Sequence, residues 1–163
     1  MKKKPLRERS ALVYVLIALI PYSKPNLLLS YKPGLFYQEL ERISRYKEKT
    51  LKAAYERAQQ QGLIERQENL VRLTAKGRRK IAPFVAENLG GSAYPMVIFD
   101  IPEDKINTRR KFRSVLIEWN FRQIQKSVWM TGKDLRDEVV EVVKEMNLGE
   151  YVQIYESARL FPK

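Results

Sequence analysis

Residues 59–80 read QQQGLIERQENLVRLTAKGRRK, and this stretch predicts the most distinctive part of the fold. Gly62 is placed to end a preceding helix, because glycine readily adopts the left-handed conformation that closes helices. Residues 63–67 and 70–74 then predict two short strands joined by a tight turn. The basic cluster at 74–80 opens a further helix. The stretch therefore predicts a β-hairpin held between two helices.

Two helices are predicted upstream of this hairpin. A helix at 47–61 follows a tight turn at 44–46, and a shorter amphipathic helix begins near Gly34. Two helices joined by a tight turn, with a hairpin after the second, form a winged helix-turn-helix arrangement. Residues 10–88 accordingly resemble winged-helix transcription regulators. In the second helix, the residues predicted to be buried recur every three or four positions: Leu51, Ala54, Tyr55 and Ala58.

In this arrangement the leading end of the second helix enters the major groove, and the hairpin contacts phosphates or the minor groove. We therefore expect double-stranded DNA as a partner. The alternative is a surface helix with ordinary solvated charges. The expected DNA-binding residues are Lys47, Lys49, Thr50, Lys52, Arg57, Arg66, Asn69, Arg72, Lys76, Arg78, Arg79 and Lys80.

Positive charge is concentrated in the first half of the chain. Residues 1–90 carry 19 Lys/Arg against 8 Asp/Glu, whereas residues 91–163 carry 12 against 11. A basic half joined to a nearly neutral half predicts one module that binds a polyanion and another with a different task.

An apolar run at 11–20 follows a lysine-rich N-terminus. Ten residues are too few to span a bilayer, and the PYSK that follows is a poor small-residue cleavage site. We expect a buried helix capped by Ser10, no membrane partner and a cytoplasmic protein. Residues 21–33 are predicted as a long connection with no assigned element.

The chain has neither cysteine nor histidine. Thiol catalysis, thiolate zinc sites and imidazole chemistry are therefore excluded. Any catalysis would rest on carboxylates, hydroxyls, Lys or Arg, around a hard divalent cation held by oxygen. We expect no cofactor unless the protein is a nuclease, which would use Mg²⁺ or Mn²⁺.

Gly, Ser and Pro cluster at 88–95, which predicts a linker at 90–95 between domains at 1–89 and 96–163. The order of elements predicted beyond it is typical of a ferredoxin-like sandwich, so the fold class is α+β. These elements are a strand at 96–99, a helix capped by Asn107 or Thr108 that ends near Trp119, one bent or two short strands within 121–131, a helix from Asp134 and a strand at 151–155.

Residues 96–156 resemble two related families through a combination of short motifs, which are Asp100-Ile101, Arg109-Arg110, Gln125 and Ser127-Val128-Trp129. One family comprises the small CRISPR-associated adaptation proteins called Cas two. The other comprises PaaX-like repressors, the phenylacetate-catabolism regulators, in their middle domain. The Asp-Ile-Pro and Ser-Val-Trp motifs and the preceding winged helix are more similar to the PaaX-like branch.

The PaaX-like resemblance implies a DNA-binding transcriptional repressor that is not an enzyme and forms a homodimer through its second domain. In that branch Asp100 caps a turn before Ile101 and Pro102. The alternative is a CRISPR-associated adaptation protein, a metal-dependent endonuclease whose partner is an integrase subunit. Asp100 from each subunit would then be the catalytic and metal-binding residue.

Overall fold

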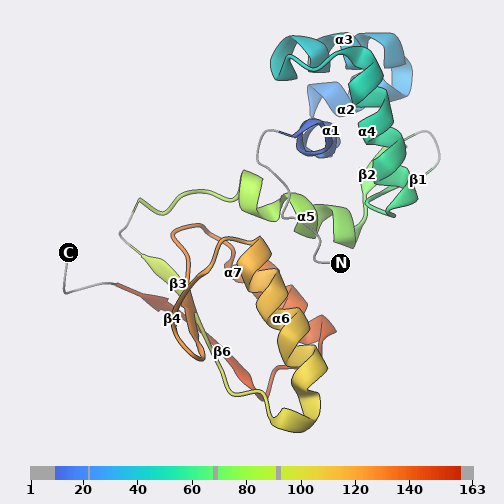
Figure 1. Ribbon diagram of the computed structural model, residues 1–163. Coiled ribbons are helices and arrows are strands. Elements are labelled where there is room, and N and C mark those ends of the chain that lie inside the picture. The colour runs from blue at the N-terminus through green and yellow to red at the C-terminus, as the bar shows by residue number, and fades with distance from the viewer. Residues whose placement is uncertain (1–9, 22, 68–69, 91–92, 159–163) are drawn as a thin grey trace. The chain divides into compact units, whose positions relative to one another are not determined.

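The computed structural model describes residues 10–21, 23–67, 70–90 and 93–158 (Figure 1). The chain combines α-helices with antiparallel sheets, which confirms the predicted α+β class. It divides into two compact units, residues 1–84 and 85–163. Among the described residues, no helix is long and apolar enough to cross a membrane.

The first unit is built around α1 (Ala11–Ala18). Ser10 caps this helix, and its hydroxyl accepts a hydrogen bond from the Val13 amide at 3.4 Å. Because the helix is apolar on nearly all sides, it needs cover from several neighbours. Three further helices of the unit pack against it, and Leu16 and Leu19 are completely buried.

The predicted connection at 21–33 is wrong, because this segment contains the helix α2 (Lys24–Tyr31). Ser23 caps the helix through its hydroxyl, and a proline occupies the first turn, where its missing N–H costs no hydrogen bond. Asn26 is buried, and its Nδ2 donates to the carbonyl oxygen of Val71 at 2.9 Å. A hydrogen bond between residues far apart in the sequence therefore fastens α2 to the hairpin.

Two helices, α3 (Pro33–Ser44) and α4 (Glu48–Gln60), occupy the positions where helices are predicted. Their buried faces contribute to one hydrophobic core together with α1. Tyr55, expected in the buried stripe of α4, is only half-buried. The fully inward positions are Phe36, Tyr37 and Leu40 in α3 and Leu51, Ala54 and Ala58 in α4.

A β-hairpin follows α4 directly. Gly62, at φ +63°, ends the helix in the left-handed conformation that favours glycine. Strands β1 (Ile64–Gln67) and β2 (Leu70–Leu73) pair antiparallel, with Ile64 opposite Leu73. The hairpin leads into α5 (Ala75–Val85).

The first turn of α5 packs very closely against Leu63, which lies in the loop after α4. A Cβ atom at Gly77 would lie 2.0 Å from the carbonyl oxygen of Leu63, so only glycine fits there. The hydroxyl of Thr74 donates to the Gly62 carbonyl at 2.8 Å and accepts from the Gly77 amide at 3.1 Å. The loop after α4 and the first turn of α5 therefore form one hydrogen-bonded junction.

The second unit contains, in chain order, a strand, a helix, two strands, a helix and a strand. The strands form one antiparallel sheet in the order β4-β5-β3-β6. Both α-helices lie on the same side of this sheet (Figure 1). The elements are β3 (Tyr94–Phe99), α6 (Ile106–Glu118), β4 (Arg122–Gln125), β5 (Val128–Met130), α7 (Arg136–Glu145) and β6 (Val152–Ser157).

Alternate residues of the central strand β3 point to opposite faces of this sheet. Val97 and Phe99 are buried on the helix side, where the Phe99 ring meets the Phe112 ring edge-to-face at 5.4 Å. Met96 and Ile98 lie on the other face and are only half-buried. The core of this unit therefore sits between the sheet and its two helices.

Both helices of the second unit begin at positions that differ from the predicted ones. A 3₁₀ turn at Glu103–Lys105 leads into α6, which starts at Ile106. The predicted cap by Asn107 or Thr108 is wrong, because the backbone is already helical there. The other helix, α7, starts two residues after Asp134.

The division between the units falls between Phe84 and Val85, earlier than the predicted boundary after residue 89. Backbone hydrogen bonds explain this position. The Leu89 amide donates to the Gly132 carbonyl at 2.8 Å, and the Asp134 amide donates to the Glu87 carbonyl at 2.9 Å. Residues 85–89 therefore pack with the second unit.

Candidate nucleic-acid interface

The net charge of the chain lies entirely in the first unit. Residues 1–84 carry 19 Lys/Arg and 7 Asp/Glu, whereas residues 85–163 carry 12 of each. Dividing the chain at the structural boundary thus sharpens the asymmetry that the sequence indicates. A polyanion would be attracted to the first unit, and the net charge of the second adds nothing to that attraction.

A three-residue turn presents the leading end of α4 to solvent. Arg45 adopts a left-handed conformation at φ +61°, which reverses the chain between α3 and α4. The hydroxyl of Ser44 stabilises the turn, since it donates to the Leu40 carbonyl at 2.6 Å and accepts from the Tyr46 amide at 3.2 Å. The predicted site residues in the first turn of α4 that are exposed here are Lys47, Lys49 and Thr50.

Lys52 is exposed one turn further along α4, but its ammonium group already has partners. Its Nζ lies 2.6 Å from the carboxylate of Glu48 and 5.4 Å from the centroid of the Tyr37 ring. Burial raises the pKa of the Tyr37 hydroxyl to about 12, with nearby Tyr55, Glu56 and Glu48 adding to the shift. The Tyr37 ring is therefore neutral, and the Lys52 ammonium lies over its face.

A hollow of about 560 Å³ lies on the exposed face of α4. Charged side chains surround it, with the small side chain of Ala53 among them. Arg57, another predicted site residue, is exposed in the last turn of the same helix. The residues that line the hollow are Glu48, Lys49, Lys52, Ala53 and Glu56.

The two arginines of the hairpin that are expected to bind DNA, Arg66 and Arg72, point to opposite faces. Arg72 pairs with Glu65 across the strands, whereas Arg66 pairs with the buried Val71. Directly paired residues share a face, so Arg66 lies on the core side of the hairpin, near Tyr55, and Arg72 on the other. Both are exposed. Asn69 lies outside the described residues.

The basic cluster at the start of α5 is largely engaged within the unit. The Lys76 ammonium donates to the Gln61 carbonyl at 2.7 Å, which satisfies an acceptor at the C-terminal end of α4. The Arg78 guanidinium donates to the Leu73 carbonyl at 3.1 Å. Arg79 and Lys80 are half-buried. Lys76 and Arg78 are exposed but hold backbone carbonyls, which distinguishes them from Lys47 and Lys49 of the α4 end.

Arg45 was absent from the predicted site, although it is exposed and directly precedes the leading end of α4. The tight turn at 44–46 is the signal that could have found it. Arg45 adds a third exposed cation next to Lys47 and Lys49 in the sequence.

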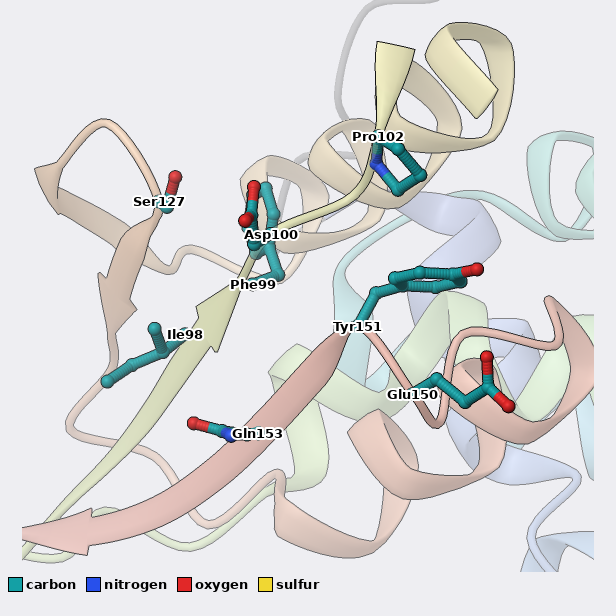
Figure 2. A pocket seen from close by; sticks show the side chains of 8 residues that line it. All are labelled: Ile98, Phe99, Asp100, Pro102, Ser127, Glu150, Tyr151 and Gln153. Carbon is teal, nitrogen blue, oxygen red and sulfur yellow. The ribbon is translucent and has the colours of Figure 1, made fainter. Parts of the chain in front are cut away.

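In the second unit, Asp100 lies at the open end of β3 and lines a hollow of about 600 Å³ (Figure 2). Its amide donates to the Tyr151 carbonyl at 2.9 Å, and the Phe99 amide donates to the Ser127 carbonyl at 3.1 Å. The Glu150 carboxylate lines the same hollow but points away from Asp100 (Figure 2). Asp100 is exposed and directly follows β3, the strand that lies between β5 and β6 in the sheet.

The residues around Asp100 do not form a metal site within one copy of the chain. Among the described residues, no three or more acidic side chains cluster closely enough to hold a metal ion. Mg²⁺ takes about six oxygen ligands, usually keeps several waters among them, and is held by one or two protein carboxylates together with substrate oxygens. At the end of β3, the described part of one copy offers such an ion the exposed carboxylate of Asp100, while Glu150 points away from it (Figure 2).

Two of the three arginines of α6 also have structural partners. Arg109 donates to the Ile101 carbonyl at 3.2 Å, directly after Asp100. Arg113 donates to the Lys126 carbonyl at 2.9 Å, and its guanidinium lies 5.6 Å from the centroid of the Phe99 ring. These contacts fasten α6 to the ends of the strands.

Comparison with known proteins gives a specific result for the second unit. Residues 92–162 match the family model described as the PaaX protein central Cas2-like domain. This match supports a relationship to PaaX-like proteins. No curated protein matches the chain.

A solved structure, the uncharacterized protein Rv0674 from Mycobacterium tuberculosis, is 19% identical to the chain, with a TM-score of 0.38. The likeness covers 94% of this chain and 64% of that one. The chain thus spans less than two thirds of the length of that protein.

Proposed function

We propose that this protein is a DNA-binding transcriptional repressor of the PaaX-like type. Its first unit is a winged helix that reads duplex DNA, and its second unit is a ferredoxin-like domain that forms a homodimer. One observation carries the proposal. The helix α3, a tight turn, α4 with a cationic leading end and a hairpin follow one another in the unit that holds all the net positive charge.

The physical support lies in the fit between this order and duplex DNA. The leading end of a second helix of this kind enters the major groove, while a following hairpin reaches the adjacent backbone. Lys47 and Lys49 are exposed at that leading end, and Arg72 is exposed on the hairpin. The match of residues 92–162 to a PaaX domain supports a regulator over other DNA-binding roles.

Replacing both Lys47 and Lys49 with alanine should weaken binding to a random-sequence duplex by roughly 50-fold at 0.1 M salt, since two fewer counterions are released. Fluorescence anisotropy of a labelled duplex with the full chain measures this change. The matched control replaces Lys111 and Lys144, two exposed lysines of the second unit, and should bind like the parent chain. Equal loss in both double variants would contradict DNA binding by the first unit.

The homodimer is proposed through the face of the sheet that lies opposite its helices. Among the described residues of this unit, no helix covers that face. Apolar side chains from three strands are exposed or half-buried there, which is unfavourable unless another surface covers them. Twofold symmetry would also supply two copies of α4 to a palindromic site. The apolar residues are Tyr94, Met96, Ile98, Val128, Met130 and Tyr155.

Replacing Ile98 with lysine should convert the dimer to a monomer, because the charge would be buried unpaired at the centre of the interface. Sedimentation of the full chain measures this. A concentration of tens of micromolar suits the test, because a specific interface of standard size holds a dimer together in that range. Ile117→Lys is the control, since Ile117 is 59% exposed on α6. A monomeric parent chain, or a dimeric Ile98→Lys variant, would refute this interface.

The second candidate function is a nuclease subunit of CRISPR adaptation with an integrase partner. It is favoured by one observation, the open position of Asp100 at the end of β3. In this function two copies related by a twofold axis would bring their Asp100 carboxylates to one shared cation.

We expect no cleavage of single- or double-stranded DNA or RNA by the parent chain with Mg²⁺ or Mn²⁺. The Asp100→Asn variant should behave identically, because the amide preserves the shape of the side chain at the strand end. Gel assays of both proteins with each metal measure this. Metal-dependent cleavage that disappears in Asp100→Asn would establish the nuclease function instead.

A further inference from the structure

The exposed face of α4 carries two acidic side chains. A surface that binds only phosphates would not need acidic side chains, because they repel phosphates. Glu48 and Glu56 lie two turns apart on this face, with Lys52 between them. A carboxylate facing a polyanion weakens binding to every sequence alike, unless it accepts a hydrogen bond from a base. The acidic residues therefore need an explanation that general attraction to DNA does not supply.

The Lys52 side chain is exposed, and its ammonium has two neighbours within the first unit. It lies 2.6 Å from the Glu48 carboxylate and 5.4 Å from the centroid of the Tyr37 ring. Tyr37 is 9% exposed and belongs to α3, so the ring itself is fixed by the core. A lysine held on two sides loses less conformational entropy on binding than a free one.

We propose that the hollow on α4 reads a G·C base pair in the major groove. This proposal rests on the proposed function and deepens it. Lys52 donates to the O6 and N7 acceptors of guanine, and Glu56 accepts from the N4 amino group of the paired cytosine. Glu48 is a positioning residue, since it orients Lys52.

The complementarity follows from what each base pair displays. A G·C pair presents two adjacent acceptors and then a donor, which match an ammonium beside a carboxylate. Glu48, Lys52 and Glu56 follow at intervals of four residues, so they lie along one stripe of the helix. Ala53 leaves the space between the charged side chains open for the edge of the base pair.

The test is selection of binding sites by the full chain from a random-sequence duplex pool. The parent chain should select sites with one G·C pair that the Glu56→Gln and Lys52→Gln variants no longer require. The expected loss is about tenfold or more in discrimination at that single position. Glu48→Gln should reduce the same preference without moving it to another position, as its role is to orient Lys52.

Arg72→Gln provides the matched control, because its side chain on the hairpin is assigned to the DNA backbone. It should weaken binding to all sequences alike and leave the preferred base pair unchanged. Circular dichroism of each variant verifies that these exposed substitutions leave the fold intact.

The outcomes separate the two proposals. If no duplex is retained by the parent chain, DNA binding itself is refuted. In a second outcome, the parent chain retains duplexes while the Glu56→Gln and Lys52→Gln variants keep its sequence preference. That result would support DNA binding and refute recognition of a base pair by the hollow on α4. Loss of preference in Arg72→Gln alone would likewise overturn it, since sequence would then be read by the hairpin.

Discussion

Raising the salt concentration from 50 to 200 mM should weaken binding of the full chain to duplex DNA by about 500-fold. The α4 helix and the hairpin present five exposed cations for which the described part of the chain provides no ion pair. If each neutralises one phosphate, the plot of log K against log salt has a slope of about −4.5. The five are Lys47, Lys49, Arg57, Arg66 and Arg72.

Two single variants show whether these cations are the source of the slope. Arg72→Gln should reduce its magnitude by about 0.9, since one phosphate contact is lost. Lys76→Gln should change it far less, because the Lys76 ammonium is held by the Gln61 carbonyl. Anisotropy titrations at several salt concentrations measure both slopes. A parent slope near zero would contradict an interface built on phosphate contacts.

Replacing Gly77 with alanine should destabilise the first unit by about 3 kcal/mol or more. The new Cβ would lie 2.0 Å from the Leu63 carbonyl oxygen, so backbone atoms would have to move apart. That oxygen also accepts the Thr74 amide hydrogen bond at 3.0 Å. Relief of the clash therefore disrupts the junction between α4 and α5.

Urea unfolding with two probes localises this effect. Both tryptophans of the chain, Trp119 and Trp129, lie in the second unit, so their fluorescence reports that unit alone. Far-ultraviolet circular dichroism reports the helices of both units. Gly77→Ala should lower the stability seen by circular dichroism and leave the fluorescence midpoint unchanged.

Gly34→Ala is the control for Gly77→Ala. No atom lies within 4 Å of a Cβ built at Gly34, which lies in the first turn of α3. Alanine there should be neutral or stabilise the unit by about 0.5 kcal/mol, since it restricts the unfolded chain. An unchanged stability of Gly77→Ala would mean that α5 does not pack closely on Leu63.

Local patterns predicted most elements because each signal acts within a few residues. The spacing of Leu51, Ala54 and Ala58 predicted the buried face of α4, and Gly62 predicted its end. The helix α2 was missed, since its run of three leucines has no helical period and prolines stand close to both of its ends. Ser23 before a proline was a usable signal for that helix.

Exposure of the candidate site was partly predictable, whereas partners of its charged groups were not. Periodicity placed Lys49 and Lys52 on the outer face of α4, and both are exposed. Nothing local indicated that Lys52 would lie over Tyr37, because that contact joins two helices. Nor did the pattern of the hairpin show that Arg66 and Arg72 occupy opposite faces, which depends on the strand register.

Composition and local periodicity were enough to predict the fold class, the hairpin after α4 and the concentration of positive charge in one unit. These properties follow from composition and from periodicities that short-range sterics and burial impose. Only the folded chain shows that Lys76 and Arg78 hold backbone carbonyls, that Asn26 fastens α2 to the hairpin and that Gly77 must lack a side chain. Those contacts join segments that pack together only in the folded chain, so no local pattern encodes them.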